Sequence, residues 1–442
     1  MIWHAAAAWL PGGLAADVTI EEKDGRFSAI SPDSPPPPSA TRLAGVVFPG
    51  LANAHSHAFH RALRGRAHGA RGSFWAWRDL MYSVALRLDP DRYLALARAV
   101  YAEMVLAGVT TVGEFHYLHH GPGGKPYADA NAMGAALVQA AADAGARITL
   151  LDTCYLAGGL SAAGHEPLSP AQRRFADPGP SQWAARVSAL PPAPHMVVGA
   201  AAHSVRAVPE AALGQVAVAA GDAGWPLHLH LSEQREENEA CLGFYGRTPA
   251  RLCADQGALG PATTAVHATH LTSADIDILA RSGAGVCICP TTERDLGDGV
   301  GPGRELAGRG VPLCLGSDQH GTVDLLAEAQ ALEMDERLVS GERVRFPIPE
   351  LVTALTTGGH RQLGWPDCGE LRPGARADLV AVRLDTVRTA GTDPAQAVMV
   401  AGAGDVHTVV VEGRTVVSGG YHTLGDVGQL LAAAIAPLWG DE

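Results

Sequence analysis

Short apolar runs alternate with helical stretches along most of the chain. Eight runs rich in Val, Ile, Leu and Ala are typical of buried strands, and longer stretches with helical spacing of apolar residues separate them. The predicted strands are 46–54, 110–115, 147–154, 196–202, 226–231, 264–268, 285–289 and 312–316. The predicted helices include 91–107, 128–144, 209–223, 235–256 and 273–281. This alternation is typical of the α/β class and favours a (β/α)8 barrel of the TIM type.

The two ends of the chain follow a different pattern. Alternating apolar and polar residues flank the turn Asp24-Gly25, and strand-like signals return at 378–382 and 406–411. We predict a barrel at 49–365 and a small β-sandwich domain built from residues 1–48 and 366–442, the latter with a terminal helix. A doubly wound sheet is the alternative, but no GxGxxG follows an early predicted strand.

Composition narrows the class of partner. The net charge of −13 argues against a nucleic-acid binder, because such binding requires a basic footprint. The apolar run 430–439 is about half as long as the ~20 residues needed to cross a bilayer. A signal peptide begins with a positively charged region, but no Lys or Arg precedes Lys23. The seven scattered cysteines contain no CxxC pair, which suits free thiols. These features predict a cytoplasmic protein without membrane or nucleic-acid partners.

Histidines and carboxylates gather where the predicted strands end. Residues two apart on a strand share a face, and the carboxyl ends of barrel strands meet at one mouth. The strand-end residues are His55 and His57, then His228, His230 and Glu233, then His267 and His270, and finally Asp318. Three neutral imidazoles and one carboxylate form a catalytic zinc-type shell with an open water position.

These motifs resemble the amidohydrolase superfamily over nearly the whole chain. The resemblance implies four metal ligands: His55, His57, His230 and Asp318. The superfamily's His-x-x-Glu spacing selects His230, which leaves His228 as a deeper barrel residue. Binuclear members bridge two metals through a carboxylated lysine or a carboxylate, but neither Lys23 nor Lys125 lies where that bridge is found. We therefore expect one divalent ion, with zinc ahead of iron.

A mononuclear site of this pattern resembles the aminohydrolases, which displace ammonia from a C–N centre. The resemblance implies that Asp318 or Glu233 takes a proton from the attacking water. Glu233 then delivers a proton to the departing nitrogen, and His267 polarises the reacting group. His270 is the alternative to His267.

The segment 58–82 is rich in aromatic residues and arginine, and it is expected to build the pocket or a lid. The stretches HSHAFHRALRG, FWAWRDLMY, GEFHYLHH, AHSVRAV and HLHLSEQ resemble in detail the branch of the superfamily that hydrolyses N-formimidoyl-L-glutamate to N-formyl-L-glutamate and ammonia in histidine degradation. The residues implied to bind this substrate, which carries two carboxylates, are His60, Arg78, Tyr117, His203 and Arg206. His60 departs from the branch, which usually has Gln there.

Several alternatives stay open. The chain could be another aminohydrolase, acting on guanine, a triazine or an adenosine derivative, or a non-catalytic scaffold of the same fold. The arginines and the complete set of ligands weigh against both. We expect His119 and His120 to lie at the surface rather than to bind metal. A homodimer is expected, because dimers are common in the superfamily.

Overall fold

The computed structural model describes residues 1–66 and 74–440. Eight parallel strands form one sheet in the order β14-β13-β12-β11-β10-β7-β6-β5. Its edges meet where Ser56 bridges Asp318, and the N–H of Asp318 donates to the carbonyl of His55 at 3.0 Å. The barrel strands are β5 (Leu51–Ser56), β6 (Val109–His116), β7 (Arg147–Cys154), β10 (Met196–Ala202), β11 (Leu227–Leu231), β12 (Thr263–His267), β13 (Gly285–Ile288) and β14 (Leu313–Leu315). The predicted barrel is confirmed.

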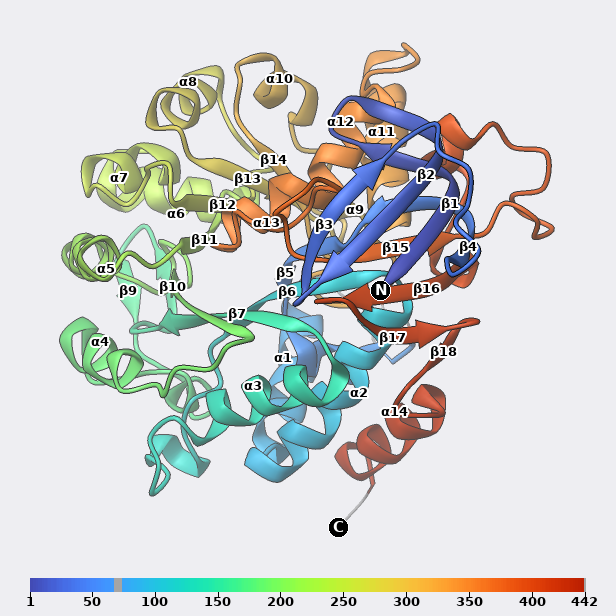
Figure 1. Ribbon diagram of the computed structural model, residues 1–442. Helices are drawn as coiled ribbons and strands as arrows, with labels where there is room; N and C mark the ends of the chain where they lie inside the picture. Colours follow the sequence, from blue (N-terminus) through green and yellow to red (C-terminus); the bar gives the residue numbers. More distant parts are fainter. Residues whose placement is uncertain (67–73, 441–442) are drawn as a thin grey trace.

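Helices surround this barrel (Figure 1). Some of them begin or end at ordinary capping residues: the Asp89 side chain accepts from the N–H of Arg92 at the start of α2, and Gly145 takes the left-handed conformation after α3. The helices are α1 (Phe74–Arg87), α2 (Pro90–Leu106), α3 (Ala132–Ala144), α4 (Pro180–Ser188), α5 (Glu210–Ala223), α6 (Arg235–Tyr245), α7 (Pro249–Asp255), α8 (Ser273–Ser282), α9 (Pro290–Leu296), α10 (Gly303–Gly308), α11 (Leu325–Ser340), α12 (Ile348–Thr353), α13 (Gly359–Gln362) and α14 (Val427–Ile435). In the part of the chain that the structure describes, none of them is long and apolar enough to cross a membrane.

A second eight-stranded sheet lies beside the barrel and is built from both ends of the chain, as predicted (Figure 1). Strand β4 joins the two ends, because it pairs parallel with β1 and antiparallel with β15. A separate apolar cluster that includes Trp3, Ile20 and Phe27 fills this domain. Its strands are β1 (Ile2–Leu10), β2 (Gly13–Lys23), β3 (Arg26–Ser31), β4 (Thr41–Pro49), β15 (Leu379–Val382), β16 (Val406–Val411), β17 (Arg414–Ser418) and β18 (Tyr421–His422). A short hairpin, β8 (Gly159–Ser161) and β9 (Gly164–Glu166), stands apart from both sheets.

Two predicted elements are each divided in the structure. The predicted strand 46–54 is split at Gly50 into β4 and β5, where a Cβ would stand 2.3 Å from Thr110 Oγ1 and 2.9 Å from Asp378 Cβ. The predicted helix 235–256 is split into α6 and α7 by Gly246, which has a φ of 67°. In both places a glycine allows a close approach or a turn that the apolar periodicity alone does not show.

A buried arginine joins the two domains at the amino ends of the barrel strands, the end we call the base. Arg147 begins β7 and pairs with Asp378 and with Glu412, the latter at 3.2 Å. Its guanidinium carbon lies 5.6 Å from the ring centre of Trp365. Only 1% of the Arg147 side chain is exposed and none of the Asp378 side chain, so this pair is buried between the barrel and the second sheet.

Candidate metal centre and active site

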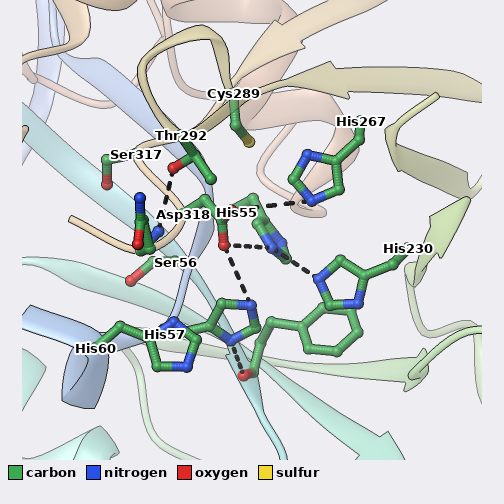
Figure 2. A network of polar contacts seen from close by, with 12 residues as sticks. His55, Ser56, His57, His60, His230, His267, Cys289, Thr292, Ser317 and Asp318 are labelled. Carbon is green, nitrogen blue, oxygen red and sulfur yellow. Dashed lines mark hydrogen bonds and ion pairs between the residues drawn. The ribbon is translucent and has the colours of Figure 1, made fainter. Parts of the chain in front are cut away.

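The four predicted metal ligands converge at the carboxyl ends of the barrel strands, the end we call the mouth (Figure 2). Asp318 Oδ1 lies 3.3 Å from Nε2 of His55 and 3.4 Å from Nε2 of His57. Nε2 of His230 lies 3.1 Å from Nε2 of His55. Atoms within 4.8 Å of one another form two groups that share His55: His55 with His57 and Asp318, and His55 with His230 and His267. Imidazole nitrogens and a carboxylate oxygen therefore surround a centre beside His55.

The orientation of these rings suits a divalent cation. Nδ1 of His57 donates to the carbonyl of Phe115, and Nδ1 of His230 donates to the carbonyl of His203, both at 2.9 Å. The Nε2 lone pairs of these two rings therefore point to the common centre. Burial lowers the pKa of His57 to about 3 and lowers the pKa values of His55 and His230 well below their usual range. Neutral imidazoles beside a carboxylate are the donor set of a catalytic metal site, so these residues fit such an ion.

The structure separates the histidines that the sequence left as alternatives. His228 lies deeper in the barrel, where its Nε2 donates to the carbonyl of Gln362 at 3.1 Å. His267 stands beside the ligands, with Nε2 3.9 Å from Asp318 Oδ2 and 3.9 Å from Glu233 Oε1. His270 is half-buried and does not line the cavity described below. Of the alternatives His228 and His230, therefore, His230 lies at the site, and of His267 and His270, His267 does.

A carboxylate that our sequence analysis missed lies behind His267. Glu293, on α9, pairs with Nδ1 of His267 at 3.4 Å and accepts from the N–H of Cys289 at 3.0 Å. Burial lowers the pKa of His267, but the carboxylates of Glu233, Glu293 and Asp318 outweigh it and raise this pKa to about 10. The sequence feature that could have indicated Glu293 is its place as an acidic residue in the first turn of the helix after the seventh barrel strand.

The backbone at the mouth is strained where the site residues stand. Five residues there that are not glycine adopt a left-handed backbone, with φ between 43° and 67°: Ser232, His267, Ala268, Asp318 and His320. Such conformations cost on the order of 1–3 kcal/mol each and persist only where surrounding contacts hold them. Their concentration here supports a functional site at this end of the barrel.

A cavity of about 290 Å³ opens beside this cluster. Glu233, His267 and Asp318 lie on its inner wall, together with His57 and His230. Its other walls are largely aromatic and are formed by Trp77, Tyr82, Tyr117, Tyr155 and Phe175. A small organic substrate could therefore reach the predicted metal ligands.

All five predicted substrate-binding residues line this same cavity: His60, Arg78, Tyr117, His203 and Arg206. Nε2 of His60 lies 2.7 Å from the hydroxyl of Tyr117, and the guanidinium carbon of Arg78 lies 5.6 Å from the ring centre of Tyr82. The predicted pocket segment 58–82 contributes His60, Trp77 and Arg78 to these walls, and its residues 67–73 lie outside the described residues.

The model of the amidohydrolase family matches residues 46–416, which is most of the chain. The chain belongs to the amidohydrolase family. Formimidoylglutamate deiminase of Pseudomonas aeruginosa is 37% identical to this amidohydrolase, and the match covers 95% of each of the two chains. The 8-oxoguanine deaminase of the same species is 30% identical, over 98% of this chain and 96% of the other. The crystal structure of an amidohydrolase from Brucella melitensis is similar with a TM-score of 0.91 and 32% identity, covering 99% of this chain and all of the other.

Arg206 of this amidohydrolase stands between two carboxylates. Its Nη2 lies 2.8 Å from Glu233 Oε2, and its Nε lies 2.9 Å from Glu237 Oε2. From the sequence we expected Arg206 to face the substrate, and no pattern pointed to Glu237. In the structure Arg206 lines the cavity and also contacts the predicted acid–base residue.

The expectation that His119 and His120 lie at the surface is wrong. Both rings are buried, and they belong to a polar network beneath the loop that follows β6. Nε2 of His119 donates to the carbonyl of Thr153 at 2.9 Å, and Nε2 of His120 lies 3.3 Å from Asp177. Arg186 pairs with Asp177 and Asp152 at 2.8 Å each, so one guanidinium holds both carboxylates of this network. Buried polar contacts therefore fix the loop after β6 to distant segments.

Proposed function

We propose that this amidohydrolase hydrolyses N-formimidoyl-L-glutamate to N-formyl-L-glutamate and ammonia. The observation that carries the proposal is that Arg78 and Arg206 line the same cavity as the cluster of predicted metal ligands. The first relative reported above, a formimidoylglutamate deiminase, supports it. An amidine carbon would lie at the ligand cluster while the arginines face the carboxylates of the glutamate portion.

The metal that we propose is one divalent ion, zinc, held by His55, His57, His230 and Asp318. Such an ion, when bound, lowers the pKa of a water molecule toward neutrality and so supplies a nucleophile. The buried, neutral imidazoles described above support this assignment. The Nδ1 atoms of His57 and His230 are fixed by backbone carbonyls, so these two rings need no rearrangement to act as ligands.

The protein side chains would move the protons. Asp318 and Glu233 line the cavity and are the proposed bases for the attacking water, and Glu233 then gives a proton to the departing nitrogen. His267, held by Glu293, presents Nε2 toward Glu233 and Asp318 and would stabilise the charge that develops at the reacting group.

The glutamate portion would lie against the outer part of the cavity. His60, Arg78, Tyr117, His203 and Arg206 are the proposed contacts. At position 60 the imidazole Nε2 lies within hydrogen-bond distance of the Tyr117 hydroxyl, so this contact joins two of the proposed residues. A homodimer and a cytoplasmic location stay predictions from the sequence.

The test is ammonia release from a panel of substrates. We expect kcat/KM for N-formimidoyl-L-glutamate to exceed that for 8-oxoguanine, guanine, adenosine and a triazine by about a hundredfold to ten-thousandfold, since two lost charged hydrogen bonds cost about 3–6 kcal/mol. Metal analysis of the same preparation should give one divalent ion per chain. A higher kcat/KM for 8-oxoguanine would replace this proposal with the function of the second relative.

A further inference from the structure

One buried carboxylate of the cavity wall is used by no step proposed above. Glu237 lies in the first turn of α6, and only 2% of it is exposed. Burial raises the pKa of Glu237, while the charge of Arg206 works in the opposite direction. Burying a charged carboxylate destabilises the folded protein unless nearby polar or positively charged groups contact both of its oxygens.

Each oxygen of Glu237 has a separate partner. Oε2 lies 2.9 Å from Nε of Arg206. Oε1 accepts from the N–H of Ser232 at 2.8 Å, and Ser232 is one of the strained residues, with a φ of 51°. Ser232 directly precedes Glu233, so this hydrogen bond fixes the turn that carries the predicted acid–base residue.

Glu237 therefore reaches Glu233 by two routes. One route is the backbone of Ser232, and the other is the guanidinium of Arg206, whose Nη2 lies 2.8 Å from Glu233 Oε2. Both routes end at the same carboxylate inside the cavity. A side chain whose only task was to stabilise α6 would require neither contact.

We propose that Glu237 is a positioning residue, which fixes Arg206 against the cavity wall and holds the carboxylate of Glu233 in place for proton transfer. It does not touch the reacting atoms. The inference rests on the proposed function, because that function gives Arg206 and Glu233 their roles toward the substrate.

The experiment compares Glu237→Gln with Glu239→Gln in the metal-loaded enzyme. Both substitutions remove one negative charge from α6, but Glu239 is exposed and outside the cavity. Glutamine keeps the shape of Glu237 and can still accept from the N–H of Ser232, but it removes the negative charge that faces Arg206, so we expect kcat/KM to fall by about tenfold to a hundredfold. KM should rise as well as kcat fall, whereas a loss of folded protein would lower kcat alone. Glu239→Gln should leave both constants unchanged.

A second measurement uses Arg206→Met. This substitution leaves Glu237 buried without its cation, so adding Glu237→Gln should raise the urea midpoint of the Arg206→Met protein. In the wild type, by contrast, Glu237→Gln should lower the urea midpoint. The loss of kcat/KM that Glu237→Gln causes should also largely disappear in the Arg206→Met background, because one interaction cannot be lost twice. If Glu237→Gln alone does not fold, a double variant that folds supports the inference.

Three results would overturn the assignment. These are kinetic constants of Glu237→Gln that match those of Glu239→Gln, additive effects on kcat/KM and on the midpoints, or a double variant that does not fold. A wild type that releases no ammonia from N-formimidoyl-L-glutamate would instead overturn the proposed function. The urea midpoints would then still test the pairing of Glu237 with Arg206.

Discussion

The two ends of the barrel each place an arginine between two carboxylates, but the surroundings of the two arginines differ. At the base, Arg147 pairs with Asp378 and Glu412 and is closed off by Trp365. At the mouth, Arg206 pairs with Glu233 and Glu237 and borders an open cavity. The base arginine joins two domains, whereas the mouth arginine has access to a ligand. The same ionic motif is therefore closed between two domains at one end, and at the other it borders the cavity of the proposed active site.

The largest effect should come from the acid–base carboxylate at the mouth. Glu233→Gln keeps the size of the side chain and can still accept from Arg206, but it removes the group that carries the proton. We expect kcat to fall by roughly 10²–10⁴ while the metal content stays at the wild-type level. Steady-state kinetics and elemental analysis measure the two quantities. Normal turnover would assign all proton transfer to Asp318.

At the base, a substitution of the arginine should affect folding and leave catalysis intact. Arg147→Met leaves Asp378 buried without a cation, so we expect the free energy of unfolding to fall by about 3–5 kcal/mol. Urea unfolding measures this loss, and kcat and KM of the folded fraction should not change. Arg98→Met is the control, because Arg98 is 39% exposed and its loss should cost less than about 1 kcal/mol. A changed KM in Arg147→Met would break the comparison.

Much of the mouth was predictable from the sequence because strand ends determine position there. His55 and His230 lie near the carboxyl ends of β5 and β11, and His57 and Asp318 come shortly after β5 and β14, so the fold alone brings them together. Glu293 and Glu237 lie on helices, and only the way each helix turns decides whether its carboxylate points to the site. Their functional contacts could not be predicted from local spacing.

The base was not predictable for a different reason. Arg147 and Asp378 are 231 positions apart, and nothing in either segment indicates the other. The pair exists because both chain ends form one sheet that packs under the barrel. His120 shows the same limit, since its partner Asp177 belongs to a distant loop. Tertiary pairing, rather than local pattern, decided these cases.

The third prediction concerns the arginine of the mouth. Arg206→Met should lower kcat/KM for N-formimidoyl-L-glutamate by one to two orders of magnitude, because a charge-assisted hydrogen bond in a buried site is worth about 1.5–3 kcal/mol. The metal content should stay unchanged. An amide analogue of the substrate should cost the wild type a similar factor and the variant much less. Equal penalties in both proteins would mean that Arg206 acts only through Glu233 and does not contact a substrate carboxylate.

The smallest effect should come from the outer part of the base cluster. Asp367 pairs with Arg26 at 2.8 Å and with Arg376 at 3.1 Å, and its side chain is 33% exposed. Burial raises the pKa of Asp367, but the two arginines outweigh it and the net shift is downward. A carboxylate with a lowered pKa stabilises the fold above the pKa of the unfolded chain, near 4, and this stabilisation is lost as the pH falls through the folded value.

Asp367→Asn should therefore reduce the free energy of unfolding at pH 7 by less than about 1 kcal/mol, since solvent screens a partly exposed pair. The difference between variant and wild type should shrink as the pH is lowered from 5 toward 3, because the wild-type carboxylate then becomes protonated. Urea unfolding at a series of pH values measures both trends, and kcat/KM at pH 7 should be the same for the two proteins. A difference that grows on acidification would show that Asp367 is not held ionised by its arginines. A change in kcat/KM would show that the charges of the base reach the mouth, against the division of roles drawn above.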